Sequence, residues 1–390
     1  MKSYYDVIVI GAGPAGSVAA GTAAEQGLDV LLIEKRQEIG EPVRCAEGIQ
    51  KQGLSDFIEP DPKWICAEIK KGRVYAPDGT VLRFTQNSDP AGYVLDRKIF
   101  DRALAKKAAK AGAQIAVKTQ ATSLMKDDGI ITGIKGIHQG NEFEARSKVV
   151  IGADGVESKV GRWAGLMGSL KLKDLESCAE FTVSDINIDP ECCEIYFGNS
   201  ISPGGYLWVF PKGERTANIG LGILGTRLNG TPPVEYLKRY MDSTFPEGKI
   251  IQAIAGAVPL CDMKGPISTS GLMLAGDGAR LVDPLFGAGI MNAMLSGRMA
   301  GNNAVYAIQN GDVTAQALKR YDDEVQERIG KAIHRNYMVK EVLVNTSDRR
   351  MNRIIHGLKR VNIENVQIDR LFNSITTSGI SLHQMMQAIF

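Results

Sequence analysis

The stretch DVIVIGAGPAG near the start of the chain constrains the fold more than any other feature. An apolar, mostly β-branched run at residues 7–10 leads directly into Gly11-x-Gly13-x-x-Gly16, and an Ala-rich stretch follows. A second apolar run at residues 28–33 comes next. This order predicts a strand, a tight turn, a helix and a second strand. It is the βαβ unit of a doubly wound α/β sheet.

The glycines and the acid that closes this unit predict a dinucleotide site. Gly11 allows the turn, Gly13 lets the backbone approach a pyrophosphate, and Gly16 lets the helix pack closely on the strand. The helix N-terminus offers N–H groups and a positive dipole end to the phosphates. Glu34, at the end of the second strand, suits the two hydroxyls of an adenosine ribose and argues against a 2′-phosphate, despite Lys35 beside it. The dinucleotide is therefore an NAD or an FAD.

Composition narrows the class of protein. A chain of 390 residues, 44% hydrophobic and 23% charged, predicts a folded protein of two or three domains. A formal charge of +2 gives no reason to expect nucleic acid as a partner. The six cysteines lack paired metal-ligand spacing, so we expect no metal and a reduced, intracellular protein. Residues 7–24 are uncharged but rich in glycine, which favours a soluble cytoplasmic protein over a membrane span.

Two later stretches each place an acid after an apolar strand. KVVIGADGVESKVGRW places Asp154 there, and GLMLAGDGARLVDPLFGAGI places Asp277 there before the Gly289-Ile290 helix start. Ligands of doubly wound sheets bind at such carboxyl ends of strands. Asp277 suits a polyol chain, and the N–H groups of the later loop suit an electron-rich ring edge. Either acid taken alone is better explained by an ordinary Asp-Gly turn.

The three motifs together resemble the flavoprotein superfamily typified by p-hydroxybenzoate hydroxylase. The resemblance implies FAD in a discontinuous Rossmann-like domain, with Asp277 on the ribityl chain and Gly289 near the isoalloxazine. It also implies that Arg97 reaches the FAD phosphates and that the backbone at Ala121 contacts the adenine. An ion pair with Asp101 at i,i+4 is the alternative for Arg97. The implied cofactor-binding positions are Gly11, Gly13, Ala15, Gly16, Glu34, Lys35, Cys45, Ala46, Gly48, Arg97, Ala121, Asp154, Asp277, Gly289 and Ile290.

Two further stretches resemble the geranylgeranyl reductase family, and within it the archaeal digeranylgeranylglycerophospholipid reductases. EIGEPVRCAEGI, residues 38–49, matches a segment that lies along the flavin in that family. The family strand signature is Tyr-x-Trp-x-Phe-Pro, followed some residues later by Gly-x-Gly. Here these residues are Tyr206, Trp208, Phe210, Pro211, Gly220 and Gly222. The likeness extends from residue 7 to about residue 297.

The resemblance implies an FAD-dependent reductase that saturates the double bonds of geranylgeranyl chains by hydride transfer from flavin N5. Tyr206, Trp208 and Phe210 share one strand face, which we expect to form an apolar wall for an isoprenoid lipid. A strand buried in a sandwich of the second domain is the alternative. Cys45 is a candidate proton donor or conformational latch, with a small buried hydrophobe as the alternative.

The sequence leaves alternatives open for the electron donor and for the class of reaction. A ferredoxin, a deazaflavin or a nicotinamide would each serve as the external reductant. An FAD-dependent aromatic monooxygenase or halogenase is the alternative function, because the same fold serves all these activities. Flavin halogenases carry a related Trp-x-Trp-x-Ile-Pro strand, from which Tyr206 and Phe210 depart.

The domain borders are predicted from pattern. We expect an inserted mixed β-sheet substrate domain and a helical C-terminal region beside the FAD-binding domain. The predicted ranges are 1–60, 96–174 and 266–315 for the FAD-binding domain, 61–95 and 175–265 for the substrate domain, and 316–390 for the helical region. Residues 319–360 hold eleven basic and six acidic side chains, an excess of five positive charges. This excess favours a solvated helix face, with peripheral contact with a membrane surface as the alternative.

Overall fold

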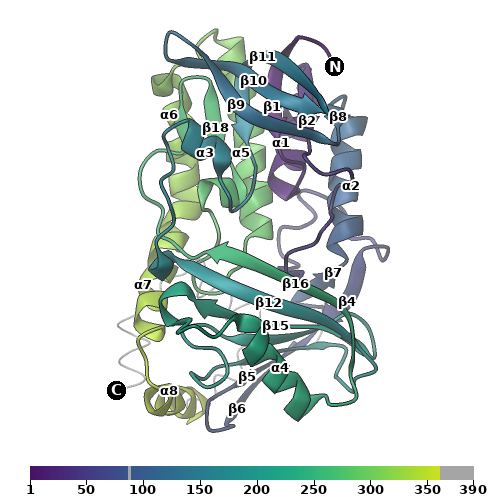
Figure 1. The fold of residues 1–390 in the computed structure, drawn as a ribbon, viewed down its shortest axis with the longest axis vertical. Helices are drawn as coiled ribbons and strands as arrows, with labels where there is room; N and C mark the ends of the chain where they lie inside the picture. The colour runs from purple at the N-terminus through teal and green to yellow at the C-terminus, as the bar shows by residue number, and fades with distance from the viewer. Residues whose placement is uncertain (87–88, 361–390) are drawn as a thin grey trace. The chain divides into compact units, whose positions relative to one another are not determined.

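The computed structural model describes residues 1–86 and 89–360, which belong to two units built from interleaved stretches of the chain (Figure 1). Unit 1 contains Met1–Val43, Arg97–Ser169 and Cys261–His334. Unit 2 contains Arg44–Asp96, Leu170–Leu260 and, among the described residues, 335–360. The predicted α/β class with a mixed inserted sheet is confirmed.

The unit borders follow strand pairing and differ from the predicted domain ranges, which stay a prediction. Residues 44–60 group with unit 2 because β3 (Gly48–Gln50) pairs with β7 (Gly92–Leu95) of that unit. The helical residues after 315 divide between the units at residue 334. Residues 361–390 of the predicted helical region lie outside the described residues.

Unit 1 is built on an eight-stranded sheet. Its main path runs β17-β18-β11-β1-β2-β8, and β9 and β10 continue from β11 as antiparallel strands. The strands are β1 (Tyr4–Ile10), β2 (Val30–Ile33), β8 (Gln114–Ala116), β9 (Thr119–Asp127), β10 (Ile130–His138), β11 (Asn141–Gly152), β17 (Ser268–Thr269) and β18 (Leu272–Leu274). The helices of unit 1 are α1 (Pro14–Glu25), α2 (Arg97–Lys110), α3 (Lys159–Trp163), α5 (Ile290–Gln309) and α6 (Ala315–Val325).

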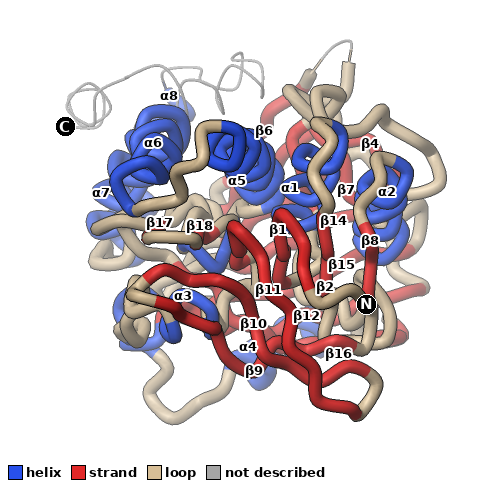
Figure 2. Tube along the Cα trace, turned by 90° about the horizontal axis from the view of Figure 1, so that it is seen from above, coloured by secondary structure: helices blue, strands red, loops and turns tan. Residues whose placement is uncertain are grey.

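The parallel strands of unit 1 are buried on both faces, which explains their uninterrupted apolar sequence. Every residue of β2 is buried, and so are the last four residues of β11. Helices α1 and α5 lie side by side against this sheet (Figure 2). Their backbones come close at Gly297, where any Cβ would overlap the carbonyl oxygen of Ala15.

Unit 2 is built on a seven-stranded mixed sheet in the order β16-β12-β15-β14-β13-β5-β6 and a three-stranded sheet in the order β3-β7-β4. The remaining strands are β4 (Ile65–Ile69), β5 (Lys71–Tyr75), β6 (Val81–Thr85), β12 (Leu175–Ser184), β13 (Cys192–Tyr196), β14 (Leu207–Pro211), β15 (Thr216–Leu224) and β16 (Lys249–Pro259). Helix α4 (Pro233–Thr244) covers one face of the larger sheet. Phe181, Val183, Ile219 and Leu221 form the core there with α4.

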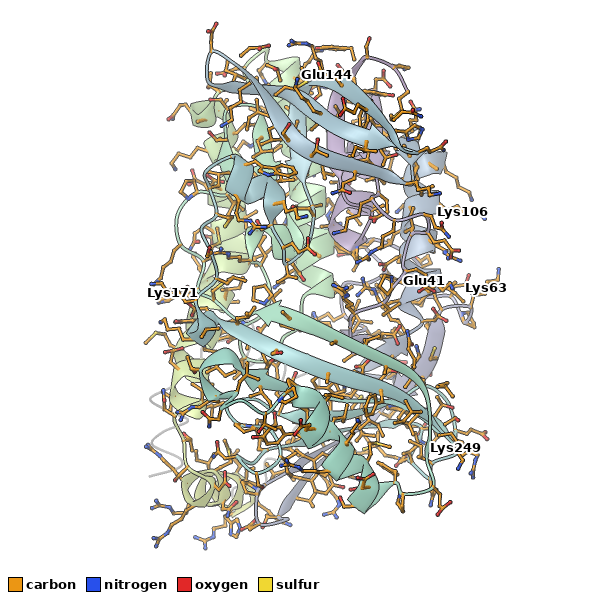
Figure 3. The ribbon with its side chains drawn as sticks, in the orientation of Figure 1. Glu41, Lys63, Lys106, Glu144, Lys171 and Lys249 are labelled. Carbon is orange, nitrogen blue, oxygen red and sulfur yellow. The ribbon has the colours of Figure 1, made fainter. Side chains whose placement is uncertain are left out.

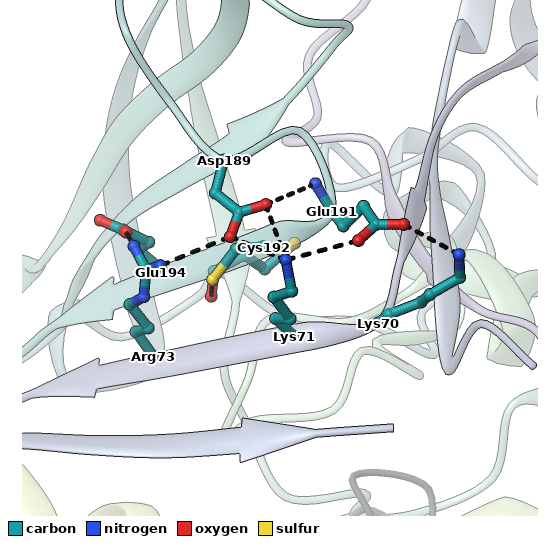
Figure 4. A network of polar contacts seen from close by, with 8 residues as sticks. Lys70, Lys71, Arg73, Asp189, Glu191, Cys192 and Glu194 are labelled. Carbon is teal, nitrogen blue, oxygen red and sulfur yellow. Dashed lines mark hydrogen bonds and ion pairs between the residues drawn. The ribbon is translucent and has the colours of Figure 1, made fainter. Parts of the chain in front are cut away.

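The parallel β5–β13 pair is flanked by ion pairs (Figure 4). Lys70 pairs with Glu191 at 2.8 Å, and Lys71 pairs with Asp189 at 3.1 Å. Such partly exposed pairs contribute about 0–1 kcal/mol each. They therefore add little to the stability of the unit.

The last described helices are α7 (Lys331–Leu343), which crosses the unit border, and α8 (Asp348–Arg360). The apolar side of α8, with Met351 and Ile355, packs on β6. Charged side chains occupy exposed strand positions elsewhere, for example Glu144 and Lys249 (Figure 3). Within the described residues, every helix is too short or too polar to cross a membrane.

The core under α4 leads to a stability prediction. Ile219 is fully buried on β15, so Ile219→Ala should lower the free energy of unfolding by about 2–5 kcal/mol through lost burial and a cavity. Ile251 on β16 of the same sheet is 64% exposed, so Ile251→Ala should change it by less than about 0.5 kcal/mol. Urea unfolding followed by circular dichroism measures both. Equal effects of the two changes would contradict this packing.

Candidate active site

The carboxyl ends of four neighbouring parallel strands in unit 1 lie level with one another. Ile10 of β1 is in register with Ile33 of β2 and with Gly152 of β11, which in turn is in register with Leu274 of β18. The glycine turn, Glu34, Asp154 and Asp277 each follow one of these ends. The sheet therefore brings together at one edge the three motifs that the sequence separates by more than two hundred residues.

The glycine turn between β1 and α1 has one open side. Gly11 has a φ of +103°, and a Cβ there would meet the backbone of Ala153. A Cβ on Gly16 would overlap the carbonyl oxygen of Gly11. Gly13, in contrast, has no atom within 4 Å of the position that a Cβ would take. Two glycines are thus needed for packing, and the third leaves room for a phosphate group beside the N-terminus of α1.

Glu34 is held against the same turn. Its Oε2 accepts a hydrogen bond from the backbone N–H of Ala12 at 3.1 Å, and its Oε1 accepts one from the N–H of Arg36 at 3.0 Å. Two backbone donors thus fix the direction of the carboxylate, as a ribose-binding acid requires. The neighbouring Lys35 is exposed and pairs with Glu157 at 3.5 Å.

Asp154 follows β11, and one of its two carboxyl oxygens is buried without a hydrogen-bond donor among the described residues. Its Oδ2 accepts the backbone N–H of Val160 at 2.9 Å. Its Oδ1 is buried and has no hydrogen-bond partner among residues 1–86 and 89–360. Burial raises the pKa of this carboxyl group. Buried acceptors are usually satisfied, so the orphaned oxygen fits a bound molecule that carries hydroxyl groups.

Asp277, after β18, lies against the start of α5. Burial raises its pKa, and the guanidinium of Arg97 opposes that rise. A Cβ on Gly289 would lie 3.1 Å from Asp277 Oδ1, so the acid and the helix start are neighbours. Gly289 caps the helix without a side-chain hydrogen bond, and Ile290 is its first residue. The unsatisfied N–H groups of this helix start suit an electron-rich ring edge.

The cofactor-binding roles predicted for Arg97 and Ala121 rest more on the family resemblance than on the geometry of this sheet edge. Arg97 forms a two-pronged ion pair with Asp101, at 2.8 and 2.9 Å, which is the alternative that the i,i+4 spacing allows. The positive charge of Arg97 nevertheless lowers the pKa of Asp277, by less than burial raises it. Ala121 is buried on β9, and Ala15 is buried in the first turn of α1. A phosphate-binding role for Arg97 stays a prediction.

The other predicted site residues belong to unit 2. Cys45, Ala46 and Gly48 lie there, in and just before β3, together with the aromatic residues of β14. The backbone N–H of Glu47 donates to Cys45 Sγ at 3.2 Å. Gly48 is covered by the ring of Phe210, which would lie 3.1 Å from a Cβ at that position.

The aromatic residues of β14 lie on the sheet face opposite α4. Trp208 is 8% exposed, and its Nε1–H donates to Glu180 Oε2 at 2.9 Å. Tyr206, just before the strand, meets Trp208 edge to face with ring centres 6.0 Å apart. Phe210 packs on the cluster formed by β4 and β7. The strand is thus largely covered, as the sandwich alternative expects, and a substrate-binding role stays a prediction.

The Gly-x-Gly of β15 has a steric reason. Trp208 is in register with Gly220, and a Cβ there would overlap the indole ring. A Cβ on Gly222 would overlap the carboxyl group of Glu176. Both glycines thus leave space over β15 for side chains that reach across from the two neighbouring strands.

Sequence reasoning missed the acids and the lysine around this face. Glu47 accepts hydrogen bonds from Lys212 Nζ and, at 2.6 Å, from Asn218 Nδ2, and its φ is +69°. A buried ion pair therefore anchors the Cys45 segment to β15 and to the end of β14. The signals were present in the sequence: Glu47 follows Cys45 closely, Lys212 follows the signature proline, and Glu180 interrupts an apolar strand.

Two buried acids of β12 share the aromatic face. Burial raises the pKa of Glu176 to about 7 and that of Glu180 to about 8. Trp208 and Lys212 oppose the rise at Glu180, and Glu47 adds to it. A carboxyl group of this kind carries a proton near neutral pH and is able to donate it.

Comparison with known proteins agrees with this geometry. A family model described as "FAD binding domain" matches residues 4–204, and the "Geranylgeranyl reductase catalytic domain" matches residues 174–258. The first match and the glycine turn define an FAD-dependent flavoprotein, and FAD is its cofactor.

The relatives identify the family more closely. The chain is 56% identical to a digeranylgeranylglycerophospholipid reductase of Methanocella arvoryzae over 98% of both chains. It is 48% identical to one of Methanosarcina acetivorans, over 100% of this chain and 97% of the relative. The chain belongs to the geranylgeranyl reductase family.

Solved structures give the same family and a wider fold. A geranylgeranyl bacteriochlorophyll reductase-like protein of Thermoplasma acidophilum matches with a TM-score of 0.90 and 38% identity, covering 99% of this chain and 96% of that one. A flavin-dependent brominase matches with a TM-score of 0.77 and 19% identity, covering 99% and 98%. At that identity the brominase shows the shared fold alone.

The open side of Gly13 leads to a binding prediction. Gly13→Val should leave the fold intact, because no atom lies near the new side chain, but should abolish FAD binding by filling the phosphate space. Gly168→Val, at another glycine of unit 1 with an open Cβ position, is the matched control and should retain FAD. Flavin absorbance after reconstitution measures both. A Gly13→Val protein that binds FAD like the control would disprove the assignment.

Proposed function

We propose that this protein is an FAD-dependent reductase that saturates the geranylgeranyl double bonds of digeranylgeranylglycerophospholipids. The near full-length match to reductases of that name carries the proposal. The reductase catalytic segment, residues 174–258, also coincides with the strands that bear Trp208 and the buried acids. An aromatic monooxygenase or halogenase has only the shared fold in its favour.

The residues of unit 1 fit the cofactor. The open side of Gly13 and the start of α1 would receive the pyrophosphate, and Glu34 would accept the ribose hydroxyls. Asp277 and the orphaned oxygen of Asp154 would accept further hydroxyls. The N–H groups at Gly289 and Ile290 would stabilise negative charge. When bound, reduced FAD supplies a hydride from N5 to one carbon of the double bond.

The residues of unit 2 would bind the lipid and supply the proton. An unactivated isoprenoid double bond offers no polar group to grip, so its binding depends on apolar surface. Tyr206 and Phe210, which are partly exposed, would provide rigid aromatic surface with few polar atoms, and the buried Trp208 would support Tyr206. Each saturated bond consumes two electrons, so the enzyme also needs an external reductant, for which a ferredoxin, a deazaflavin and a nicotinamide remain candidates.

The first functional test separates lipid reduction from oxygen chemistry. The FAD-loaded protein, reduced by light without oxygen, should be reoxidised when digeranylgeranylglycerophospholipid is added, because the alkene accepts the hydride. Flavin absorbance follows the reaction, and the fully saturated lipid is the control. Reoxidation by oxygen but not by the unsaturated lipid would contradict the proposal.

The second test concerns Cys45. Its sulfur accepts a hydrogen bond from Glu47, whose carboxylate is fixed by Lys212 and Asn218. Cys45→Ala should slow reoxidation by lipid more than flavin reduction, because the change alters the segment assigned to the alkene reaction. Cys66→Ala, at a partly buried thiol of the same unit, is the control. Equal effects of Cys45→Ala on both half-reactions would refute a direct role.

We also propose that the protein meets the membrane peripherally through α8. The apolar side of this helix packs on β6, and Arg349, Arg353 and Lys359 remain exposed. Basic side chains near an anionic surface contribute about 1 kcal/mol each. Replacing these three by Glu should reduce sedimentation with phosphatidylglycerol vesicles at low salt and leave FAD content unchanged. Unchanged sedimentation would refute this contact.

A further inference from the structure

Glu180 occupies an unusual place for an acid. It lies in the middle of β12, is 5% exposed, and stands in register with Gly220 of β15. Its chain neighbours Phe181 and Ala179 belong to the apolar core on the opposite face of the sheet. A carboxyl group in such surroundings is costly to ionise unless a cation pairs with it, so the neutral, protonated form is favoured.

The hydrogen bond of Glu180 is made with a neutral group. The indole of Trp208 reaches across Gly220, where a side chain would block it, and donates Nε1–H to Glu180 Oε2. This contact joins the acid directly to the aromatic face that the substrate proposal uses. The glycine signature of β15 thus brings an acid and an aromatic side chain together.

The cation near Glu180 is Lys212, which is paired with a different acid. Lys212 forms a direct ion pair with Glu47, which also accepts a hydrogen bond from Asn218. Burial lowers the pKa of Lys212, but Glu47 outweighs this effect and raises it. The ammonium and the Glu47 carboxylate therefore form one neutral pair, and Lys212 lowers the pKa of Glu180 by less than burial raises it.

The other titratable groups of β12 on this face are a thiol and a second acid, and the cation Lys340 lowers the pKa of that second acid, Glu176, by less than burial raises it. Cys178 and Glu176 lie two and four residues before Glu180 on β12. Burial raises the pKa of the Cys178 thiol and that of Glu176. With desolvation as the main cause and Glu47 adding to it, the pKa of Glu180 rises to about 8. This rise favours the protonated form of Glu180 at neutral pH.

We propose that Glu180 is the acid that protonates the alkene, with Trp208 holding its carboxyl group in place. This inference rests on the proposed function. In the step, the π bond breaks, one carbon takes the hydride from reduced FAD, and the other takes the proton from the Glu180 O–H. The carboxylate is then reprotonated by water, and the external two-electron reductant restores the reduced cofactor.

The main test uses Glu180→Gln, which is neutral, similar in shape and still able to accept from Trp208. Reoxidation of the reduced holoenzyme by digeranylgeranylglycerophospholipid should slow by about 10²-fold or more, the usual effect of a lost general acid. FAD content and flavin reduction by dithionite should be unchanged. Glu191→Gln, at an acid of the same unit that pairs with Lys70 and lies outside the proposed site, is the control and should react close to the wild-type rate.

The pH dependence gives an independent readout. Glu180 is protonated below its raised pKa and loses the proton above it, so the wild-type reoxidation rate should fall as pH rises through about 8. Glu180→Gln should lose this decline. In the protein without FAD, infrared difference spectroscopy should detect a neutral carboxyl band that disappears over the same pH range. That band should be absent from Glu180→Gln.

The outcomes separate the two proposals. A wild-type protein that the lipid does not reoxidise refutes the proposed function. A wild-type protein that is reoxidised, beside a Glu180→Gln variant of equal rate, overturns only the role of Glu180. If Glu180→Gln fails to fold, the infrared titration of Glu176→Gln, which removes the other buried acid of β12, decides. A carboxyl group already ionised at pH 7 overturns the inference, and one that titrates near 8 supports it.

Discussion

Close backbone approach at a few glycines is the constraint on which both units depend. In unit 1, Gly11 and Gly16 allow β1, α1 and the loop after β11 to meet, and Gly297 allows α5 to approach α1. Side chains at these positions would push the elements apart. Because they meet, the carboxyl ends of four parallel strands stay level, and the polar residues after them share one edge of the sheet.

In unit 2, two glycines of β15 make room for side chains. Gly220 and Gly222 open space on the surface of a strand, and an indole and a carboxyl group fill it. The opposite face of the same strands is a conventional apolar core under α4. One face therefore supplies stability, and the other buries polar groups that are hydrogen-bonded to one another.

The sequence predicted the parts of this structure that depend on local pattern. The strands before Gly11 and Glu34, the Asp154 and Asp277 turns, and the shared face of Trp208 and Phe210 all follow from short-range periodicity or from a family motif. The border near residue 44 did not, because it depends on the pairing of β3 with β7, between segments separated by about forty residues. The partners of Glu47 and Glu180 were missed for the same reason. Their acids are ordinary in sequence and become special only through burial and long-range contacts.

The proposed reaction couples oxidation of the reduced flavin to reduction of the isoprenoid lipid. Mass spectrometry of the lipid after anaerobic incubation with the reduced holoenzyme tests it most directly. We expect lipid that has gained one pair of hydrogen atoms for each flavin oxidised. Lipid of unchanged mass beside a flavin that still reacts with oxygen would contradict it.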